Sequence, residues 1–324
     1  MRTATEMRAA LFDRYGPPEV LYEGTVPTPA PGPGEVLVRV HAGSVNGGDG
    51  HGRAGRVRFA TDLMGRGWPK RSGIDFAGEV AALGSPMSGL KVGDRVWGGL
   101  PRVFGAAAEF VVVRPRYLAF APDGLDLVRA AALPGAGTTA ITALRDKARL
   151  TSGERLLVRG ASGGVGHVAV QLGRAYGAHV TALAGSGNLG FVRELGAHEA
   201  FDYATTGPAD LGGFDVVLDT VGTDIDAYRR LLAPGGRMVS IAFDLDHMVA
   251  SLSYMMASAV YGRRRVRFFS GIPTHALFAE LTRLVEDGTI KPFVHAVHPL
   301  SRIVEAHRAL EAGGVRGKLV VEIG

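Results

Sequence analysis

A glycine-rich turn between an apolar strand and an apolar helix constrains this chain more than any other segment. Residues 156–172 read Leu-Leu-Val-Arg-Gly-Ala-Ser-Gly-Gly-Val-Gly-His-Val-Ala-Val-Gln-Leu. Glycine lets the backbone pass close to a pyrophosphate, and the N-terminus of the next helix offers free N–H groups and a partial positive charge. Aligned to the dinucleotide fingerprint G-x-G-x-x-G, the loop is Ala161–Gly166, with alanine at the first glycine position and Gly160 just before it. A plain strand–helix turn is the alternative, and the surrounding pattern decides between them.

That surrounding pattern is a regular alternation of strands and helices from Glu154 onward. Strands are predicted at 155–159, 179–183, 215–219 and 237–241, and helices at 166–176, 189–195 and 227–232. Such a rhythm is typical of βαβ units on a parallel sheet. In this context the loop predicts dinucleotide binding, with Ser162, Gly163, Gly164 and Val165 against the phosphates.

The remainder of the chain has a different texture. Short β-branched runs at 35–40, 78–83, 95–97 and 108–113, separated by Gly/Pro turns, indicate a small antiparallel barrel. Helices are predicted at 127–133 and 139–147, and the tail from Pro273 adds helices at 278–287 and 301–311 and strands at 293–297 and 318–323. The 324 residues fit two domains at about 150 residues each.

The charge balance points to no particular partner. Lys+Arg 36 against Asp+Glu 31 gives a net charge of +5, and the one dense basic cluster is Arg263, Arg264, Arg265 and Arg267. This cluster is a solvated face beside a sheet or an anion-binding patch. The first is favoured because no second basic stripe accompanies it, so no nucleic-acid partner is predicted. The apolar stretch Met248–Tyr261 is shorter than the roughly 20 residues of a membrane span, so a cytoplasmic protein is expected.

Cofactor choice should depend on the end of the strand at 179–183. NAD-specific sites place an acidic residue about 20 residues beyond the glycines. Here no acidic residue occurs before Glu194, so a 2′-phosphate would meet no repulsion and NADPH is predicted. Ser186 and Asn188 are candidate phosphate partners, and Ser186 is equally suited to cap the next helix.

Short motifs spread along the whole chain resemble one family. They are Tyr15–Leu21, Pro31–Val38, Val45–Asp49, Gly73–Gly78, Val92–Val96, Ala132–Ala140, the glycine loop, Glu194–Ala197, Asp219–Gly222, Pro234–Arg237 and Arg316–Val321. In this order they resemble the medium-chain dehydrogenase/reductase superfamily and, within it, the zinc-independent quinone oxidoreductase-like (zeta-crystallin-like) branch.

The resemblance implies an α/β fold of two domains. A GroES-like β-rich catalytic domain, residues 1–125 and 273–324, would be interrupted by a Rossmann cofactor-binding domain, residues 126–272, with the active site in the cleft between them. It also implies a homodimer paired through edge strands of the Rossmann sheets.

The same resemblance implies chemistry without a metal. The zinc branch carries a catalytic cysteine, a Gly-His-Glu motif and a four-cysteine lobe. This chain has Asn46 in the first stretch, Ile74 in place of the histidine, and no cysteine at all. Isoleucine cannot ligate zinc, so no metal site is predicted.

Family roles transfer to individual positions. Asn46 is expected to be the polar group beside nicotinamide and substrate, although it is also suited merely to cap a turn. The other expected cofactor contacts are Thr139 on the nicotinamide side, Tyr203 at the adenosine end, Val221 and Ile241 at strand ends, and Phe269 and Lys318 near the nicotinamide.

The predicted reaction is hydride transfer from NADPH to a quinone or an α,β-unsaturated carbonyl. Without a Lewis acid, such acceptors suit the site better than simple alcohols, because a donor near the developing oxygen charge suffices. The alternatives are a pathway-specific enoyl or ketone reductase of a biosynthetic intermediate and a non-catalytic NADPH-binding regulatory protein.

Overall fold

The chain forms two compact units, and the second is inserted into the first. The computed structural model describes residues 5–58, 62, 67–85, 87–101, 104–242, 265–269 and 272–324. Unit 1 comprises Met1–Thr138 and Ile272–Gly324, and unit 2 comprises Thr139–Gly271. The first crossing falls at Thr138, later than the boundary expected after residue 125. The reason is that α3 (Leu127–Ala130) packs on strands of unit 1.

Unit 1 is built from two β-sheets. A three-stranded antiparallel sheet has the order β2–β1–β4, with β1 Glu6–Phe12, β2 Leu21–Pro27 and β4 Lys70–Arg71. A larger sheet has the order β15–β16–β3–β5–β6–β8, and β7 also pairs with β3. Its strands are β3 Val36–Ser44, β5 Asp75–Leu83, β6 Arg95–Gly99, β7 Phe110–Val113, β8 Leu118–Phe120, β15 Val294–Pro299 and β16 Lys318–Glu322. The β-rich texture read from the first third of the sequence is therefore confirmed.

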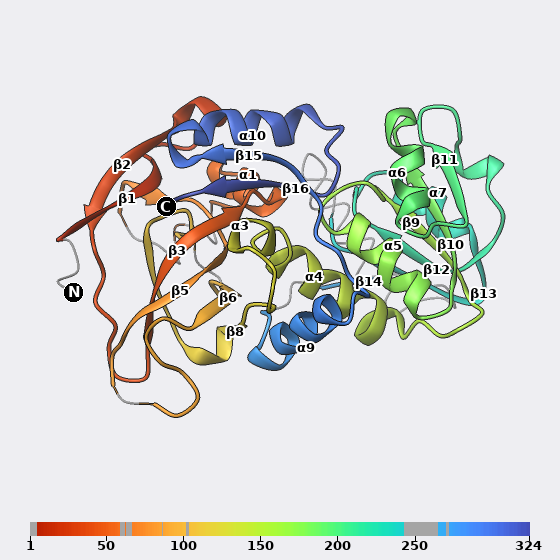
Figure 1. Cartoon of the computed structure of the whole chain (residues 1–324). Coiled ribbons are helices and arrows are strands. Elements are labelled where there is room, and N and C mark those ends of the chain that lie inside the picture. The colour runs from red at the N-terminus through yellow and green to blue at the C-terminus, as the bar shows by residue number, and fades with distance from the viewer. Residues whose placement is uncertain are drawn as a thin grey trace. The chain divides into compact units, whose positions relative to one another are not determined.

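Helices and 3-10 turns pack against these sheets. They are α1 (Gly47–Arg53), α9 (His275–Glu286) and α10 (Ile303–Ala312), with 3-10 turns η1 (Pro18–Val20), η2 (Pro115–Tyr117) and η6 (Leu300–Arg302). Helix α10 packs along β15 and β16 and against η1 (Figure 1). Its buried residues Ile303 and Ala306 join the core cluster that contains Phe76 and Leu319.

Unit 2 is a parallel sheet with strand order β11–β10–β9–β12–β13–β14. Its strands are β9 Arg155–Arg159, β10 His179–Ala184, β11 Glu199–Asp202, β12 Phe214–Asp219, β13 Leu232–Ser240 and β14 Arg265–Phe268. In chain order this arrangement is 3-2-1-4-5-6, the Rossmann order, and it confirms the predicted fold class. The helices are α4 (Pro134–Ile141, which enters the unit), η3 (Thr142–Ala148), α5 (Gly166–Ala175), α6 (Leu189–Glu194) and α7 (Ile225–Arg230), with 3-10 turns η4 (Ser186–Asn188) and η5 (Pro208–Asp210).

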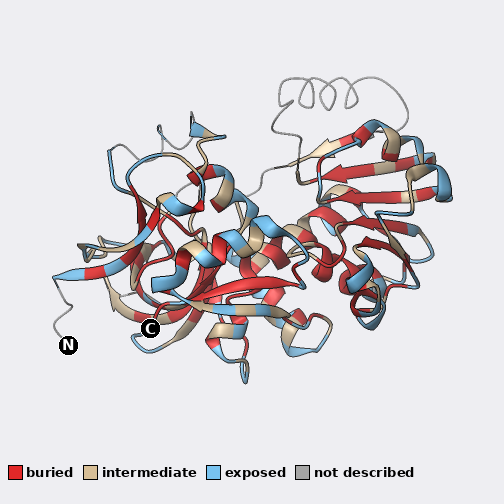
Figure 2. Ribbon diagram, turned by 90° about the horizontal axis from the view of Figure 1, so that it is seen from above, coloured by how far each residue is buried: buried red, intermediate tan, exposed pale blue. Residues whose placement is uncertain are grey.

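The central strands of unit 2 are buried on both faces. Leu156, Leu157 and Val158 of β9 are each 0% exposed, and the strands of this sheet are largely red in Figure 2. Continuous apolar runs of this kind are what a parallel sheet covered on both faces requires. Within the described residues, no helix has both the length and the apolarity to cross a bilayer.

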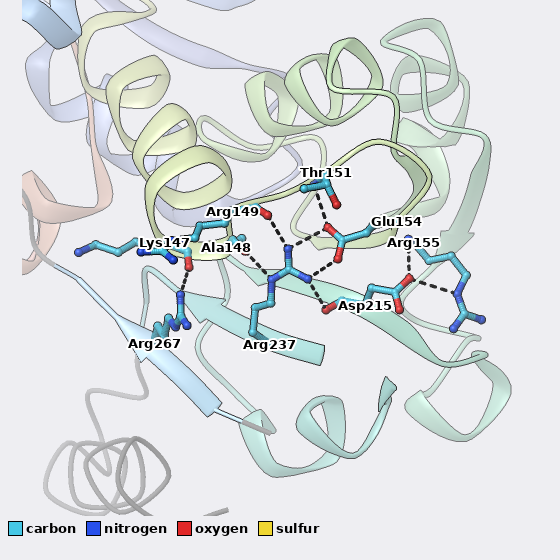
Figure 3. Close-up of polar contacts among 9 residues, drawn as sticks. All are labelled: Lys147, Ala148, Arg149, Thr151, Glu154, Arg155, Asp215, Arg237 and Arg267. Atoms are coloured by element: carbon cyan, nitrogen blue, oxygen red, sulfur yellow. Dashed lines mark hydrogen bonds and ion pairs between the residues drawn. The ribbon is translucent and has the colours of Figure 1, made fainter. Parts of the chain in front are cut away.

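A π-helix follows α4 and is held at its end by two arginines. The segment predicted as one helix over 139–147 is the end of α4 followed by the π-helix η3, which ends at Arg149 in the left-handed conformation (φ 50°). Arg237 of β13 donates to the carbonyls of Ala148 and Arg149, and Arg267 of β14 donates to the carbonyl of Lys147 (Figure 3). The terminal carbonyls of a helix lack partners within it, and these guanidinium groups supply them.

Arg237 also forms an ion pair with both oxygens of Glu154, which precedes β9 (Figure 3). Glu154 additionally accepts from the backbone N–H of Thr151 at 2.8 Å, and the hydrogen bond to Arg237 is the largest cause that lowers its pKa. Arg267, predicted as part of a solvated face, is thus an internal hydrogen-bond donor. Arg263 and Arg264 lie outside the described residues.

Replacing Arg237 with methionine should destabilise unit 2, because Glu154 and two carbonyls lose their donor while partly buried. The side chains of Arg237 and Glu154 are 16% and 22% exposed, and removal of one partner should cost about 2 to 3 kcal/mol. Arg155→Met is the matched control, since the Arg155–Asp215 pair is 52% and 33% exposed and should contribute about 0 to 1 kcal/mol. Urea unfolding of both variants measures the difference, and equal losses would contradict it.

Candidate functional site

The glycine loop lies at the carboxyl edge of the unit 2 sheet, between β9 and α5. Gly160 has φ +68°, and a Cβ there would lie 2.4 Å from Thr220 Oγ1. Gly160 thus makes the tight turn, although the fingerprint alignment assigns that position to Ala161. A Cβ on Gly166 would lie 2.1 Å from the carbonyl oxygen of Gly160, so only glycine allows α5 to begin this close to the strand. This cradle fits a dinucleotide pyrophosphate.

Hydrogen bonds fix the loop residues predicted to contact the phosphates. The N–H of Gly163 donates to the Gly160 carbonyl at 3.1 Å, and the carbonyl of Gly163 accepts from the His167 N–H at 2.9 Å. The Asn188 amide donates to Ser162 Oγ at 3.1 Å, and both side chains are buried. Asn188 is therefore turned toward the loop rather than held out for a 2′-phosphate, whereas Ser186 at the start of η4 is exposed.

Tyr203 lies beside the end of the neighbouring strand. Its N–H donates to the carbonyl of Ala184, the last residue of β10, and its side chain is 66% exposed. A Cβ on Gly185 would lie 3.5 Å from the tyrosine ring. The ring therefore stands at the carboxyl edge, where a nucleotide base requires an exposed flat surface.

A buried ion pair occupies the point where the strand order of the sheet reverses, between β9 and β12. Arg159 Nη1 lies 2.8 Å from Asp219 Oδ1 and donates to the Thr223 carbonyl at 2.7 Å, with the guanidinium 3.6 Å from the centroid of the Tyr228 ring. Both charged side chains are at most 6% exposed. Ligands of open α/β sheets bind at this reversal.

Asp219 in turn holds the two strand ends predicted to contact cofactor. Its carboxylate accepts from the N–H groups of Val221 and Gly222, each at 3.1 Å, and from Ser240 Oγ at 3.0 Å. Its carbonyl accepts from the N–H of Ile241 at 3.0 Å. Val221 is 47% exposed and available to a ligand.

Sequence reasoning assigned no role to Arg159 or Asp219, although a signal was present. An arginine that ends a buried apolar strand needs a buried acceptor, and an aspartate that ends another such strand is the natural candidate.

Thr139 and Phe269 are the other two unit 2 residues predicted to contact cofactor. Thr139 is half-buried in α4, and Phe269 directly follows β14 with the Lys147 ammonium 5.9 Å from its ring centroid. Within the described residues, no hydrogen bond ties either side chain to the glycine loop.

In unit 1, Asn46 is held by a buried lysine. Lys318 of β16 is 5% exposed, and its ammonium donates to Asn46 Oδ1 at 2.6 Å and to the Val45 carbonyl at 2.8 Å. The Asn46 amide nitrogen donates to the Ser44 carbonyl at 3.1 Å. Because an ammonium can only donate, the orientation of the amide is fixed. The structure thus brings together two of the predicted site residues, Asn46 and Lys318.

Two aspartates complete this cluster. Asp75 accepts from the Ser44 N–H and hydroxyl, each at 2.9 Å, and from the Gly135 N–H at 3.2 Å. Asn46 stands at the N-cap position of α1, and the Asp49 carboxylate accepts from its backbone N–H at 2.8 Å, as in a capping box. Burial and, to a lesser degree, the charge of Asp75 raise the pKa of Asp49 to about 7. Burial lowers the pKa of Lys318, opposed by the two aspartates.

The donor set of this cluster does not fit a zinc ion. The Asn46 oxygen is occupied by an ammonium, Asp75 is saturated by three donors, and Ile74 stands between Gly73 and Asp75 with no ligating atom. In the described part of the chain, no three His, Asp or Glu side chains converge as metal ligands would.

Comparison with known proteins places the chain in a family. Residues 32–123 match the model of the alcohol dehydrogenase GroES-like domain, and residues 195–321 match a model described as zinc-binding dehydrogenase. The chloroplast envelope quinone oxidoreductase homolog of Arabidopsis thaliana is 32% identical, with 98% of each chain covered. The chloroplastic NADPH-dependent alkenal/one oxidoreductase of the same plant is 32% identical, over 98% of this chain and 79% of that protein.

A solved structure agrees over the same span. The quinone oxidoreductase from Coxiella burnetii matches with a TM-score of 0.88 and 31% identity, covering 98% of this chain and 100% of the other. Together with the GroES-like and Rossmann units described above, these matches show that the chain belongs to the quinone oxidoreductase-like branch of the medium-chain dehydrogenase/reductase superfamily.

Proposed function

We propose that this protein is an NADPH-dependent oxidoreductase that works without a metal and transfers hydride to a quinone or an α,β-unsaturated carbonyl. The observation that carries the proposal is the Gly160–Gly166 cradle at the carboxyl edge of a Rossmann sheet. Similarity to the Coxiella quinone oxidoreductase, and to the quinone oxidoreductase homolog and the alkenal/one oxidoreductase of Arabidopsis, supports the acceptor class.

Bound NADPH would supply the hydride, and the chain's own groups would hold and orient it. In this proposal the loop binds the pyrophosphate through Ser162, Gly163, Gly164 and Val165, with Ser186 and Tyr203 at the adenosine end. Val221, Ile241, Thr139, Phe269 and Lys318 serve the nicotinamide end. The Arg159–Asp219 pair holds Val221 and Ile241 in place before any ligand arrives, which lowers the entropic cost of binding.

Asn46 would stabilise the developing charge on the acceptor oxygen. The Asn46 carbonyl is held by Lys318 and one N–H donates to the Ser44 carbonyl, while the side chain of Asp49 lies beside the amide. In this proposal the second N–H donates to the substrate oxygen when a substrate binds. A fixed donor of this kind favours the transition state without a metal, and the donor set described above supports metal-free chemistry.

Two other functions remain as competing proposals. A pathway-specific enoyl or ketone reductase would use the same cradle with a narrower substrate range, and a regulatory NADPH-binding protein would bind without turnover. The proposal further includes a cytoplasmic homodimer without nucleic-acid or membrane partners. A dimer would cover an outer strand of the unit 2 sheet, β11 or β14, each of which pairs on one side only among the residues that the structure describes.

Turnover and the role of Asn46 can be tested in the same assay. Purified protein should oxidise NADPH in the presence of members of a quinone and enone panel. Asn46→Ala should lower kcat about 10- to 100-fold, with NADPH affinity nearly unchanged, because it removes a transition-state donor. Steady-state kinetics and fluorescence titration of NADPH measure the two quantities.

Asn46→Asp separates the donor role from capping, because it keeps oxygens for the cap and for Lys318 but removes the N–H groups. It should lose as much activity as Asn46→Ala. Full activity in the Asp variant would reduce Asn46 to a cap, and NADPH binding without turnover on any acceptor would favour the regulatory protein.

The choice between NADPH and NADH is tested by a change at Ser186. Ser186→Asp should weaken NADPH binding by repulsion of the 2′-phosphate and shift the NADPH/NADH ratio of dissociation constants at least about tenfold, equivalent to about 1.4 kcal/mol. Ser186→Asn is the matched control, because asparagine has nearly the same shape as aspartate but carries no charge. An unchanged ratio in the Asp variant, or tighter binding of NADH by the wild type, would contradict NADPH specificity.

A further inference from the structure

Two residues that line a small cavity in unit 1 each have a buried polar atom without a partner. The polar residues of the lining are Asp49 of α1, His307 of α10, Ser44, Ser72 and Asp75, and the apolar ones include Ile303 and Val321. Asp49 Oδ1 and His307 Nδ1 make no hydrogen bond within the chain, and the two residues are each 2% exposed. Leaving such atoms unsatisfied is costly, so each needs a partner inside the cavity.

The cavity has room for about one water molecule, and cavities of this size with polar walls hold ordered water. We propose that one water binds here between Asp49 and His307, with Asp49 in its protonated form and His307 neutral. The Asp49 hydroxyl donates to the water, and the water donates to His307 Nδ1, so both unpaired atoms are satisfied and no charge is added.

The charges around the cavity favour this protonation state. Asp49 faces Asp75 on β5 and Lys318 on β16. Asp75 already accepts from three donors, so the proposal assigns the proton to Asp49. One carboxylate then balances one ammonium, whereas a second buried carboxylate would leave net negative charge.

His307 faces the guanidinium of Arg53 on α1, which is itself paired with Glu311 one turn further along α10. Burial and Arg53 lower the pKa of His307 to about 4, consistent with a neutral ring. Asp49, the water and His307 thus form a positioning device, because a neutral Asp49 leaves the Lys318 ammonium bound to the Val45 carbonyl and to the Asn46 side-chain carbonyl.

A crystal structure at a resolution that orders internal water tests the binding site directly. Density for one water within hydrogen-bond distance of both Asp49 Oδ1 and His307 Nδ1 is expected. A cavity without density, or collapse of the two side chains onto each other, would overturn the proposal.

The protonation states are tested by the pH dependence of unfolding, compared between wild type and variants. Between pH 4 and 7 the folded state holds more protons on Asp49 than the unfolded state, whose value is 3.8, so wild-type stability falls there as pH rises. Between pH 4 and 6.5 the folded state holds fewer protons on His307, so that contribution rises with pH.

The wild-type to variant ratio of unfolding equilibrium constants should therefore rise with pH for Asp49→Asn and fall with pH for His307→Gln, by up to about tenfold per pH unit. Val297→Ala, which shortens an exposed side chain that carries no ionisable group and does not line the cavity, is the control and should give a flat ratio. Flat ratios for both cavity variants, or slopes of the same sign, would overturn the assigned protonation states.

The pH dependence of kcat tests the link between Asp49 and Asn46, and this test rests on the proposed function. Above about pH 7 Asp49 ionises, competes for Lys318 and should lower wild-type kcat at saturating NADPH, whereas Asp49→Asn, which mimics the neutral acid, should keep a flat profile over pH 6–8. A parallel decline in both proteins would overturn the link to Asn46. Should neither protein turn over, the proposed function fails, and the water density and unfolding slopes still decide the hydrated pair.

Discussion

Parallel strands deliver all of their carboxyl ends to one edge of a sheet, and in unit 2 a single buried carboxylate ties those ends together. Asp219 binds Arg159 at the end of β9, Val221 and Gly222 after β12, and Ser240 at the end of β13. An isolated charge at such a depth would be prohibitively unstable, and the guanidinium stacked on Tyr228 compensates it. This one carboxylate therefore fixes the ends of β9, β12 and β13 relative to one another, at the edge that would meet a cofactor.

Arginine performs this internal role repeatedly in the chain. Arg237 and Arg267 cap the π-helix, and Arg159 holds the strand ends. A guanidinium has five N–H donors in a fixed plane, so it can satisfy several carbonyls and a carboxylate at once. Part of the surplus of basic residues is therefore internal hydrogen-bond donors, which explains why net charge indicated no partner.

The sequence was informative wherever a local pattern determines local structure. The glycine loop, the alternation after Glu154 and the β-branched runs near Val36 and Phe110 all predicted elements that the structure contains. Local patterns did not predict side-chain contacts between residues that are far apart in the chain. Lys318 and Asn46 are 272 residues apart, and Arg159 and Asp219 are 60 apart, so no periodicity records either pair. The π-helix likewise depends on carbonyl partners from β13 and β14, and the helical pattern of Thr139–Lys147 contains no trace of them.

The insertion of unit 2 into unit 1 also sets an order of assembly during synthesis. Unit 2 is contiguous in the chain, whereas Ala42–Ser44 of β3 pair with β16, which is made only after the whole of unit 2. Until residues 318–322 are made, Ala42–Ser44 form an open strand edge that can pair with another chain. Strand β16 also carries Lys318, which holds Asn46. The covering of this part of β3 and the placement of Asn46 therefore happen together, and a chain truncated before β16 would lack both.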